Sequence, residues 1–323
     1  MFFAEVNAMF SLKKILKGHY GIDSVNISPE QGGWTALAYQ VTDGKAAFFL
    51  KVYDKNRAST AKWTALIDDY MPVLRWLSDR TALSGKLPVP LLTTNGEYKC
   101  EDDDAVYVLY EYIAGETIGG RPLGKGCEEK LASIIAELHR YDETIPVKTE
   151  RIKENYDISF LGEMKQWLDH LPCELAPLIQ PYIGSIREMM EAALSLADDL
   201  KCSDRRLALC HTDIHGWNMM KTGGELILID WEGLKLAPVE ADLMFFANQP
   251  YVQEFLRVYR ETHKGFEIDQ NALRFYQIRR RLEDIWEFTE QLAFDIQTEK
   301  EKAETLSLLK NELEAIEDSK IDC

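Results

Sequence analysis

The sequence has no long apolar segment and no closely spaced pair of cysteines. No segment approaches the ~20 apolar residues of a membrane-spanning helix, and the N-terminal MFFAEVNAMFSLKK places its lysines after its apolar residues, unlike a secretory signal. The six cysteines contain no C-x-x-C pair, which argues against a zinc site or a redox dithiol of that kind. We therefore expect a cytoplasmic protein with reduced thiols and no membrane partner.

Basic residues are scarce. The chain has 37 lysines and arginines against 54 aspartates and glutamates, a formal net charge of −17. Such a charge repels nucleic acid and anionic membrane surfaces, and it attracts a small cationic substrate. An acidic surface that serves only solubility is the simpler alternative. We expect no nucleic-acid partner, and the sequence leaves the oligomeric state open.

The first third of the chain has the pattern of an antiparallel sheet. Three segments are rich in β-branched and aromatic residues, namely WTALAYQV, AAFFLKVY and AVYVLYEYI, and turn sequences such as TDGK and TNGE separate strand candidates. Residues 58–79 have apolar residues at helical spacing, and Pro72 is expected to kink or divide that helix.

After residue 113 the periodicity becomes mainly helical. The helices that we expect cover residues 126–141, 156–169, 174–200, 238–264 and 269–316, the last with breaks. The patterns predict an α+β protein with two unequal lobes: a small antiparallel β-rich lobe with one packed helix, residues 1–113, and a larger mainly helical lobe, residues 114–323.

The densest polar chemistry lies in HTDIHGWN and in ELILID, which ends on Asp230 after an apolar strand. The Gly223-Gly224 pair between them predicts a hairpin. A two-residue turn would place Asn218 opposite Ile229, whereas a three-residue turn would place it opposite Leu228. In either register Asn218 and Asp230 lie close together at the open end of the hairpin, where an oxygen of each can coordinate Mg²⁺.

Phosphoryl transfer requires a metal, a positioned acceptor hydroxyl and a fixed nucleotide. Asp213 could accept or orient the hydroxyl proton. Lys51 lies on a strand, on the face of Phe49 and Tyr53, and could reach phosphates, although a solvent-facing edge lysine is the simpler alternative. The glycines of the preceding loop, Gly32 and Gly33, would let backbone amides approach a phosphate.

Two histidines flank Asp213. A metal pair at i and i+4 would need a helix, and Gly216 with the strand context argues against one. We expect His211 to hydrogen-bond the backbone of the loop. For His215 both a packing role and a contact near the phosphates stay open.

Four segments resemble one enzyme group. HTDIHGWN, IDWEG, FLKVY and YEYIAGE are similar to the catalytic loop, metal motif, lysine strand and hinge of the aminoglycoside phosphotransferases and related small-molecule kinases. QGGWTALAYQ, LAPVEADLMF and the longer segment LCHTDIHGWN look most like spectinomycin phosphotransferases. The resemblance covers most of the chain. It implies the two-lobed protein-kinase-like fold, ATP and Mg²⁺ as cofactors, and an antibiotic-resistance function.

The resemblance also implies residue roles. Asp213 would be the catalytic base, Asn218 and Asp230 the metal ligands, and Lys51 the contact to the α- and β-phosphates. Backbone groups of the hinge residues Glu111, Tyr112 and Ile113 would contact adenine. The family usually pairs its lysine with a glutamate on the helix of the first lobe, but residues 58–79 contain none, which leaves Asp68 or Asp69 as candidates.

For the acceptor we expect a small cationic molecule with a hydroxyl group, bound by Glu283, Asp284 and Glu287. Glu283 and Glu287 share a helical face, where a cation would relieve their repulsion. Ordinary intrahelical ion pairs with Arg279 and Arg280 are the alternative.

Other functions stay open at this point. The same fold could phosphorylate a metabolite such as choline, homoserine or methylthioribose, or bind a nucleotide without transfer as a pseudokinase. A protein kinase is disfavoured, because no A-P-E segment follows IDWEG.

Overall fold

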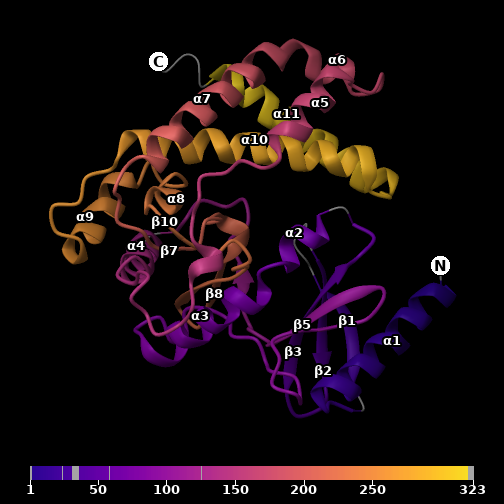
Figure 1. Ribbon diagram of the computed structural model, residues 1–323. Helices are drawn as coiled ribbons and strands as arrows, with labels where there is room; N and C mark the ends of the chain where they lie inside the picture. Colours follow the sequence, from indigo (N-terminus) through magenta and orange to yellow (C-terminus); the bar gives the residue numbers. More distant parts are fainter. Residues whose placement is uncertain (1, 24, 31–35, 58, 125, 319–323) are drawn as a thin grey trace. The chain divides into compact units, whose positions relative to one another are not determined.

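The computed structural model describes residues 2–23, 25–30, 36–57, 59–124 and 126–318 (Figure 1). The chain forms two compact units, each built from three segments. Unit 1 contains Met1–Lys153, Ala208–Leu236 and Gln249–Lys264, and unit 2 contains Glu154–Leu207, Ala237–Asn248 and Gly265–Cys323. The lobe boundary at residue 113 was inferred from secondary structure rather than from contacts, and it stays a prediction.

Unit 1 contains a five-stranded sheet of antiparallel neighbours in the order β1-β2-β3-β5-β4. The strands are β1 (Asn26–Glu30), β2 (Leu37–Thr42), β3 (Ala47–Asp54), β4 (Cys100–Glu101) and β5 (Ala105–Glu111). The antiparallel sheet expected from the sequence is confirmed, with β2, β3 and β5 at the three expected segments. The turn between β2 and β3 is closed by Asp43, whose Oδ1 accepts the backbone N–H groups of Lys45 and Ala46, both at 2.8 Å.

A helix that we did not predict, α1 (Phe2–Tyr20), covers one face of this sheet (Figure 1). Its Leu12 and Leu16 pack into a buried cluster with Leu50 and Val52 of β3 and with Leu109 of β5. Since side chains alternate along a strand, Lys51 and Tyr53 point to the opposite face.

The helix expected over residues 58–79 is divided into α2 (Thr60–Thr64) and α3 (Ile67–Arg80). The division falls at residues 65–66, and Pro72 lies inside α3 rather than at the break. α3 buries Tyr70, Met71 and Leu74.

A second, three-stranded sheet of unit 1 has the order β6-β8-β9, with β6 (Glu116–Thr117), β8 (Met219–Thr222) and β9 (Glu225–Leu228). The turn consists of Gly223 and Gly224, both at positive φ, which is what a two-residue hairpin turn requires. The Ile229 N–H donates to the Asn218 carbonyl at 3.0 Å, so the two-residue register is the one the chain adopts.

The other elements of unit 1 include a short pair of strands, two packed helices and two 3-10 turns. Strand β7 (Ala208–Cys210) pairs with β10 (Lys235–Ala237), and α4 (Cys127–Leu138) packs on α9 (Val252–Thr262). The short 3-10 turns η1 (Glu150–Ile152) and η3 (Gly216–Asn218) also belong to this unit.

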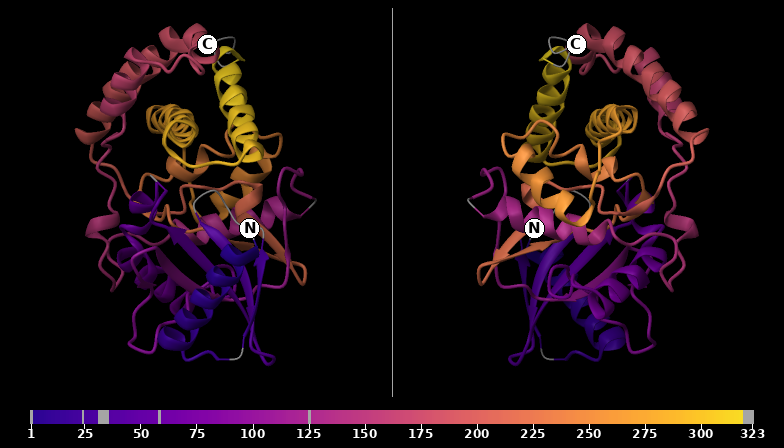
Figure 2. Two further views of the ribbon diagram at one scale, coloured as in Figure 1. Left: turned by 90° about the vertical axis from the view of Figure 1, so that its right-hand side faces the viewer. Right: turned by 90° about the vertical axis from the view of Figure 1, so that its left-hand side faces the viewer.

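Unit 2 is helical among its described residues. Its elements are α5 (Leu161–Asp169), α6 (Ala176–Ile179), η2 (Gln180–Tyr182), α7 (Ile183–Lys201), α8 (Glu240–Leu243), α10 (Gln270–Phe294) and α11 (Glu299–Asp318). Asp269 caps α10 by accepting the N–H groups of Asn271 and Ala272. α7 and α11 both pack on α10, which is seen end-on in Figure 2. In the described residues no helix combines the length and the apolar character needed to cross a bilayer.

Candidate active site

Asp213 and Asn218 are joined by hydrogen bonds within the loop between β7 and β8. The amide nitrogen of Asn218 donates to the Asp213 carboxylate Oδ2 at 2.7 Å and to the Asp213 carbonyl at 2.9 Å. The side chain of Asp213 is 31% exposed, whereas Asn218 is buried. The loop therefore presents one partly accessible carboxylate in a fixed orientation.

The loop is braced against the segment that follows β9. Thr212 has φ +67, an unfavourable backbone conformation for a β-branched residue, and its hydroxyl donates to the Gly233 carbonyl at 2.7 Å. The bond fixes the residue that immediately precedes Asp213. It thus links the loop that contains Asp213 to the segment that contains Asp230.

His211 has the structural role that its sequence context predicts. The buried ring accepts the Asp213 backbone N–H at Nδ1, at 3.3 Å, which leaves Nε2–H to donate to the Ile229 carbonyl at 2.9 Å. The ring also lies against Trp231, with 4.5 Å between centroids. His211 therefore connects the two strand ends from which Asp213 and Asp230 extend.

The second histidine lies beside the carboxylate. His215 Nε2 is 3.4 Å from Asp213 Oδ1. Its Nδ1 is buried and has no hydrogen-bond partner within the part of the chain that the structure describes. The geometry shows a contact to the candidate base, and the two alternatives from the sequence, a packing role and a contact near the phosphates, both stay predictions.

Lys51 is buried between two carboxylates. Its ammonium lies 2.7 Å from Asp230 Oδ1 and 2.5 Å from Glu232 Oε1, and the Tyr53 hydroxyl donates to the same Glu232 oxygen at 2.5 Å. Burial alone would lower the pKa of Lys51, but Asp230 and Glu232 outweigh it and hold the pKa well above its usual value. The lysine is a charged side chain with two acidic partners, not a solvent-facing edge residue.

The two candidates for the acidic partner of Lys51, Asp68 and Asp69 of α3, bond to other residues. Asp68 pairs with Lys99 at 3.0 Å and Asp69 with Arg151 at 2.8 Å. Glu232, which our sequence analysis did not single out, takes that place. The sequence feature that could have indicated Glu232 is its place as the second acidic residue of IDWEG, two residues after Asp230.

The donor atoms fit a hard divalent cation. Asn218 uses its amide nitrogen for Asp213 and Asp230 uses Oδ1 for Lys51, so Asn218 Oδ1 and Asp230 Oδ2 are the atoms that can face a metal. Carboxylate and amide oxygens are ligands that Mg²⁺ accepts. Asp230 has φ +63, a strained backbone conformation of the kind found at functional sites.

The hinge residues follow β5. The Tyr112 N–H donates to the Ala47 carbonyl at 3.1 Å and so belongs to the sheet. Because ladder bonds alternate along an antiparallel pair, the backbone groups of Glu111 point away from β3. Gly32 and Gly33 lie outside the described residues.

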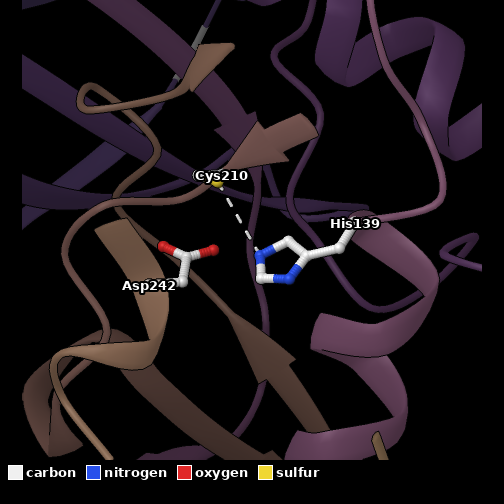
Figure 3. A group of neighbouring side chains, drawn as sticks. All are labelled: His139, Cys210 and Asp242. Atoms are coloured by element: carbon white, nitrogen blue, oxygen red, sulfur yellow. Dashed lines mark hydrogen bonds between the residues drawn. The ribbon is translucent and has the colours of Figure 1, made fainter. Parts of the chain in front are cut away.

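The strand before the catalytic loop is anchored by a buried histidine and cysteine (Figure 3). The Cys210 sulfur lies 3.8 Å from His139 Nε2, and His139 Nδ1 lies 2.9 Å from the Tyr259 hydroxyl. His139, Cys210 and Tyr259 are all buried, so this cluster connects β7 to the ends of α4 and α9. The Cys210 thiol is not accessible as a nucleophile.

The three residues expected to bind the acceptor molecule, Glu283, Asp284 and Glu287, lie on α10 in unit 2. Glu283 is 3.7 Å from Arg279, which also pairs with the buried Glu154 at 3.0 Å, and Asp284 is 2.9 Å from Arg280. Burial raises the pKa of Asp284 to about 6, although Arg280 acts in the opposite direction. Two of the three acids thus have the intrahelical partners that the alternative interpretation proposes, and Glu287 is half-buried.

The family model for the phosphotransferase enzyme family matches residues 26–290. The chain belongs to this family. It is therefore a phosphotransferase, as the resemblance of its motifs implies. No match was found among the curated proteins.

Solved structures of several kinases are similar to this phosphotransferase. Spectinomycin phosphotransferase APH(9)-Ia, in complex with ADP and spectinomycin, has a TM-score of 0.73 at 19% identity, over 95% of this chain and 96% of that one. Amicoumacin kinase hAmiN, with AMP-PNP, Ca²⁺ and Ami, has a TM-score of 0.64 at 18% identity, over 98% and 96%. Choline kinase LicA from Streptococcus pneumoniae has a TM-score of 0.62 at 16% identity, over 97% and 99%. These similarities confirm the kinase-like fold that the sequence predicts.

Proposed function

We propose that this phosphotransferase moves the γ-phosphoryl group of ATP, with Mg²⁺, onto a hydroxyl of an aminoglycoside- or aminocyclitol-like antibiotic of the spectinomycin type. The observation that carries the proposal is the pair of bonded acidic groups in unit 1: Asp213 held by Asn218, and Asp230 held by Lys51. Together these four residues supply a base, two metal oxygens and a phosphate-binding cation.

Each side chain has one task in this scheme. Asp213 accepts or orients the proton of the acceptor hydroxyl, and the amide nitrogen of Asn218 holds the carboxylate toward it. The oxygens of Asn218 and Asp230 hold Mg²⁺, which when bound supplies positive charge to the phosphates. Lys51 donates to the α- and β-phosphates.

The nucleotide is assigned mainly to residues 1–113 and the acceptor to residues 114–323. Backbone groups of Glu111, Tyr112 and Ile113 would contact adenine, and Gly32 and Gly33 would approach the phosphates. The two-lobe assignment follows from the order of the motifs along the chain.

The choice of acceptor rests on charge and on the similar structures. The acceptors named for spectinomycin phosphotransferase, for an aminopropanol kinase and for choline kinase all contain a hydroxyl group together with an amino or ammonium group. A net charge of −17 favours a cation of this kind. On α10, Glu283, Asp284 and Glu287 are the candidates for an ammonium contact, and Glu283 and Asp284 also pair with arginines.

A metabolite kinase is the second candidate function. The similarity to a choline kinase, which covers 97% of this chain, favours it. A pseudokinase is disfavoured, because the residues for transfer are present and hydrogen-bonded to one another.

An acceptor screen tests the proposal. ADP release would be measured with Mg-ATP and, in turn, spectinomycin, other aminocyclitols, amicoumacin, choline, 1-aminopropan-2-ol, homoserine and methylthioribose, with Asp213→Asn as the inactive control. We expect spectinomycin-type acceptors to stimulate release in the wild type alone. Stimulation by a metabolite only, or by no acceptor, would refute the proposed acceptor class.

A further inference from the structure

The acidic partners of Lys51, Asp230 and Glu232, do not lie on the helix of the first lobe, which usually supplies a glutamate for this lysine. Residues 58–79 have no glutamate, and the three aspartates of α3 bond to other residues: Asp68 to Lys99, Asp69 to Arg151 and Asp79 to Arg75. Tyr70 of α3 nevertheless lies near Lys51 and Glu232. Its hydroxyl is buried and has no hydrogen-bond partner in the described part of the chain. Near Lys51 and Glu232 the helix therefore contributes a buried tyrosine and no glutamate.

Glu232 is built into the site as firmly as the lysine. Its side chain is 6% exposed, and the same oxygen accepts from Lys51 Nζ and from the Tyr53 hydroxyl, both at 2.5 Å. Tyr53 lies two residues after Lys51 on β3, so both donors project from the same face of one strand. Two donors on a rigid strand thus fix one carboxylate oxygen.

The two carboxylates beside Lys51 differ in surroundings. Asp230 is 29% exposed, and its second oxygen is a candidate metal ligand, whereas Glu232 is enclosed. An ammonium has three N–H donors. One reaches Glu232 and one reaches Asp230, which leaves the third for a phosphate oxygen.

We propose that Glu232 is the positioning residue of Lys51, in place of a glutamate on α3. This inference rests on the proposed function, since it assigns Lys51 to the nucleotide. When Asp230 binds a metal its attraction for the ammonium weakens, and Glu232 keeps Lys51 in position. The lysine is then held by β3 and by the loop after β9, independently of α3.

The test uses Glu232→Gln, which removes the charge and keeps the shape, with Glu232→Asp as the conservative variant. We expect Glu232→Gln to raise the Kd for a non-hydrolysable ATP analogue and to lower kcat on the order of 10- to 100-fold, because a charge-assisted bond to a buried lysine is lost. Glu232→Asp should recover part of both values. The Mg²⁺ concentration for half-maximal activity should not change.

Tyr53→Phe tests the support of Glu232 with a smaller perturbation. It removes one hydroxyl and should lower kcat by about 3- to 10-fold, in the same direction as Glu232→Gln. The control is Glu225→Gln on β9, which removes a carboxylate bonded to Lys86 on the exposed side of the hairpin and should leave all values unchanged.

Three outcomes separate the possibilities. Wild-type analogue affinity and kcat in Glu232→Gln would overturn the inference. A raised Mg²⁺ requirement, like that of Asp230→Asn, would also overturn it and make Glu232 a metal ligand. If Glu232→Gln fails to fold, Tyr53→Phe and Glu232→Asp decide by the same criteria. Analogue binding is measured without an acceptor, so failure of the proposed acceptor class leaves this test intact.

Discussion

Replacing Gly216 by alanine should damage both the stability and the activity of unit 1. A Cβ at this position would clash with the Gly119 carbonyl oxygen, a backbone atom that cannot rotate away. The same two residues are joined by a bond from the Gly119 N–H to the Gly216 carbonyl at 2.9 Å. The new methyl group therefore has to push apart two chain segments that a hydrogen bond holds together.

The magnitude follows from these two effects. Overpacking typically costs about 1–3 kcal/mol, and the lost hydrogen bond adds about 1 kcal/mol. The reduced entropy of the unfolded chain offsets about 0.4–1 kcal/mol. The net loss of about 1–3.6 kcal/mol corresponds to a Tm decrease of about 2–14 °C for a unit of this size.

The assay combines thermal unfolding with steady-state transfer. Asn218 lies two residues after Gly216 and orients the candidate base, so we expect kcat/KM to fall more than about tenfold. Gly18→Ala on α1 is the matched control: it makes the same substitution where a Cβ would meet no atom within 4 Å, and it should stabilise by about 0.5–1 kcal/mol. A Gly216→Ala protein with the Tm and kcat of the wild type would refute the reasoning.

Four further predictions concern the acids. Asp213→Ala should abolish transfer and leave Mg-nucleotide binding, followed by calorimetry, largely intact; near-normal turnover would refute its role. Asp230→Asn should raise the Mg²⁺ concentration needed for half-maximal activity, and Asn218→Ala should do so less, whereas unchanged titrations in both would disprove the metal site. The pKa of Asp284, about 6, exceeds its unfolded value, so ionisation opposes folding and stability should fall by roughly 2–3 kcal/mol as pH rises from about 4 to 7. Urea titrations of Asp284→Asn should lack this decline, and an identical pH dependence would contradict the assignment. Glu287→Lys should raise the KM for a cationic acceptor several-fold at low salt and leave that for ATP unchanged; equal KM values in mutant and wild type would point to a surface role.

Much of the central architecture could be predicted because it is encoded by short segments. Alternating apolar residues predict β2, β3 and β5, and the Gly223-Gly224 pair predicts the hairpin that brings Asn218 and Ile229 together. The register had two alternatives in the sequence, and the choice depends on the backbone conformation of both glycines. Local chemistry of this kind is readable without tertiary contacts.

The features that were missed depend on contacts between distant residues. α1 has apolar residues at Leu12, Ile15 and Leu16, a helical spacing that was present but not used. Glu232 becomes the partner of Lys51 only when β3 and the loop after β9 meet, across 181 positions of sequence. No spacing rule within α3 could have indicated this, because the missing glutamate shows only that the usual partner is absent.

The way the chain alternates between the two units constrains how the protein can be made. Unit 1 needs Gln249–Lys264, and these residues leave the ribosome only after most of unit 2 has been synthesised. Lys51 on β3 is synthesised well before its two partners, Asp230 and Glu232. A truncated product that ends before residue 230 would therefore contain Lys51 without either carboxylate. Neither unit corresponds to one continuous stretch of the gene, so exchange between relatives by a single crossover would transfer parts of both.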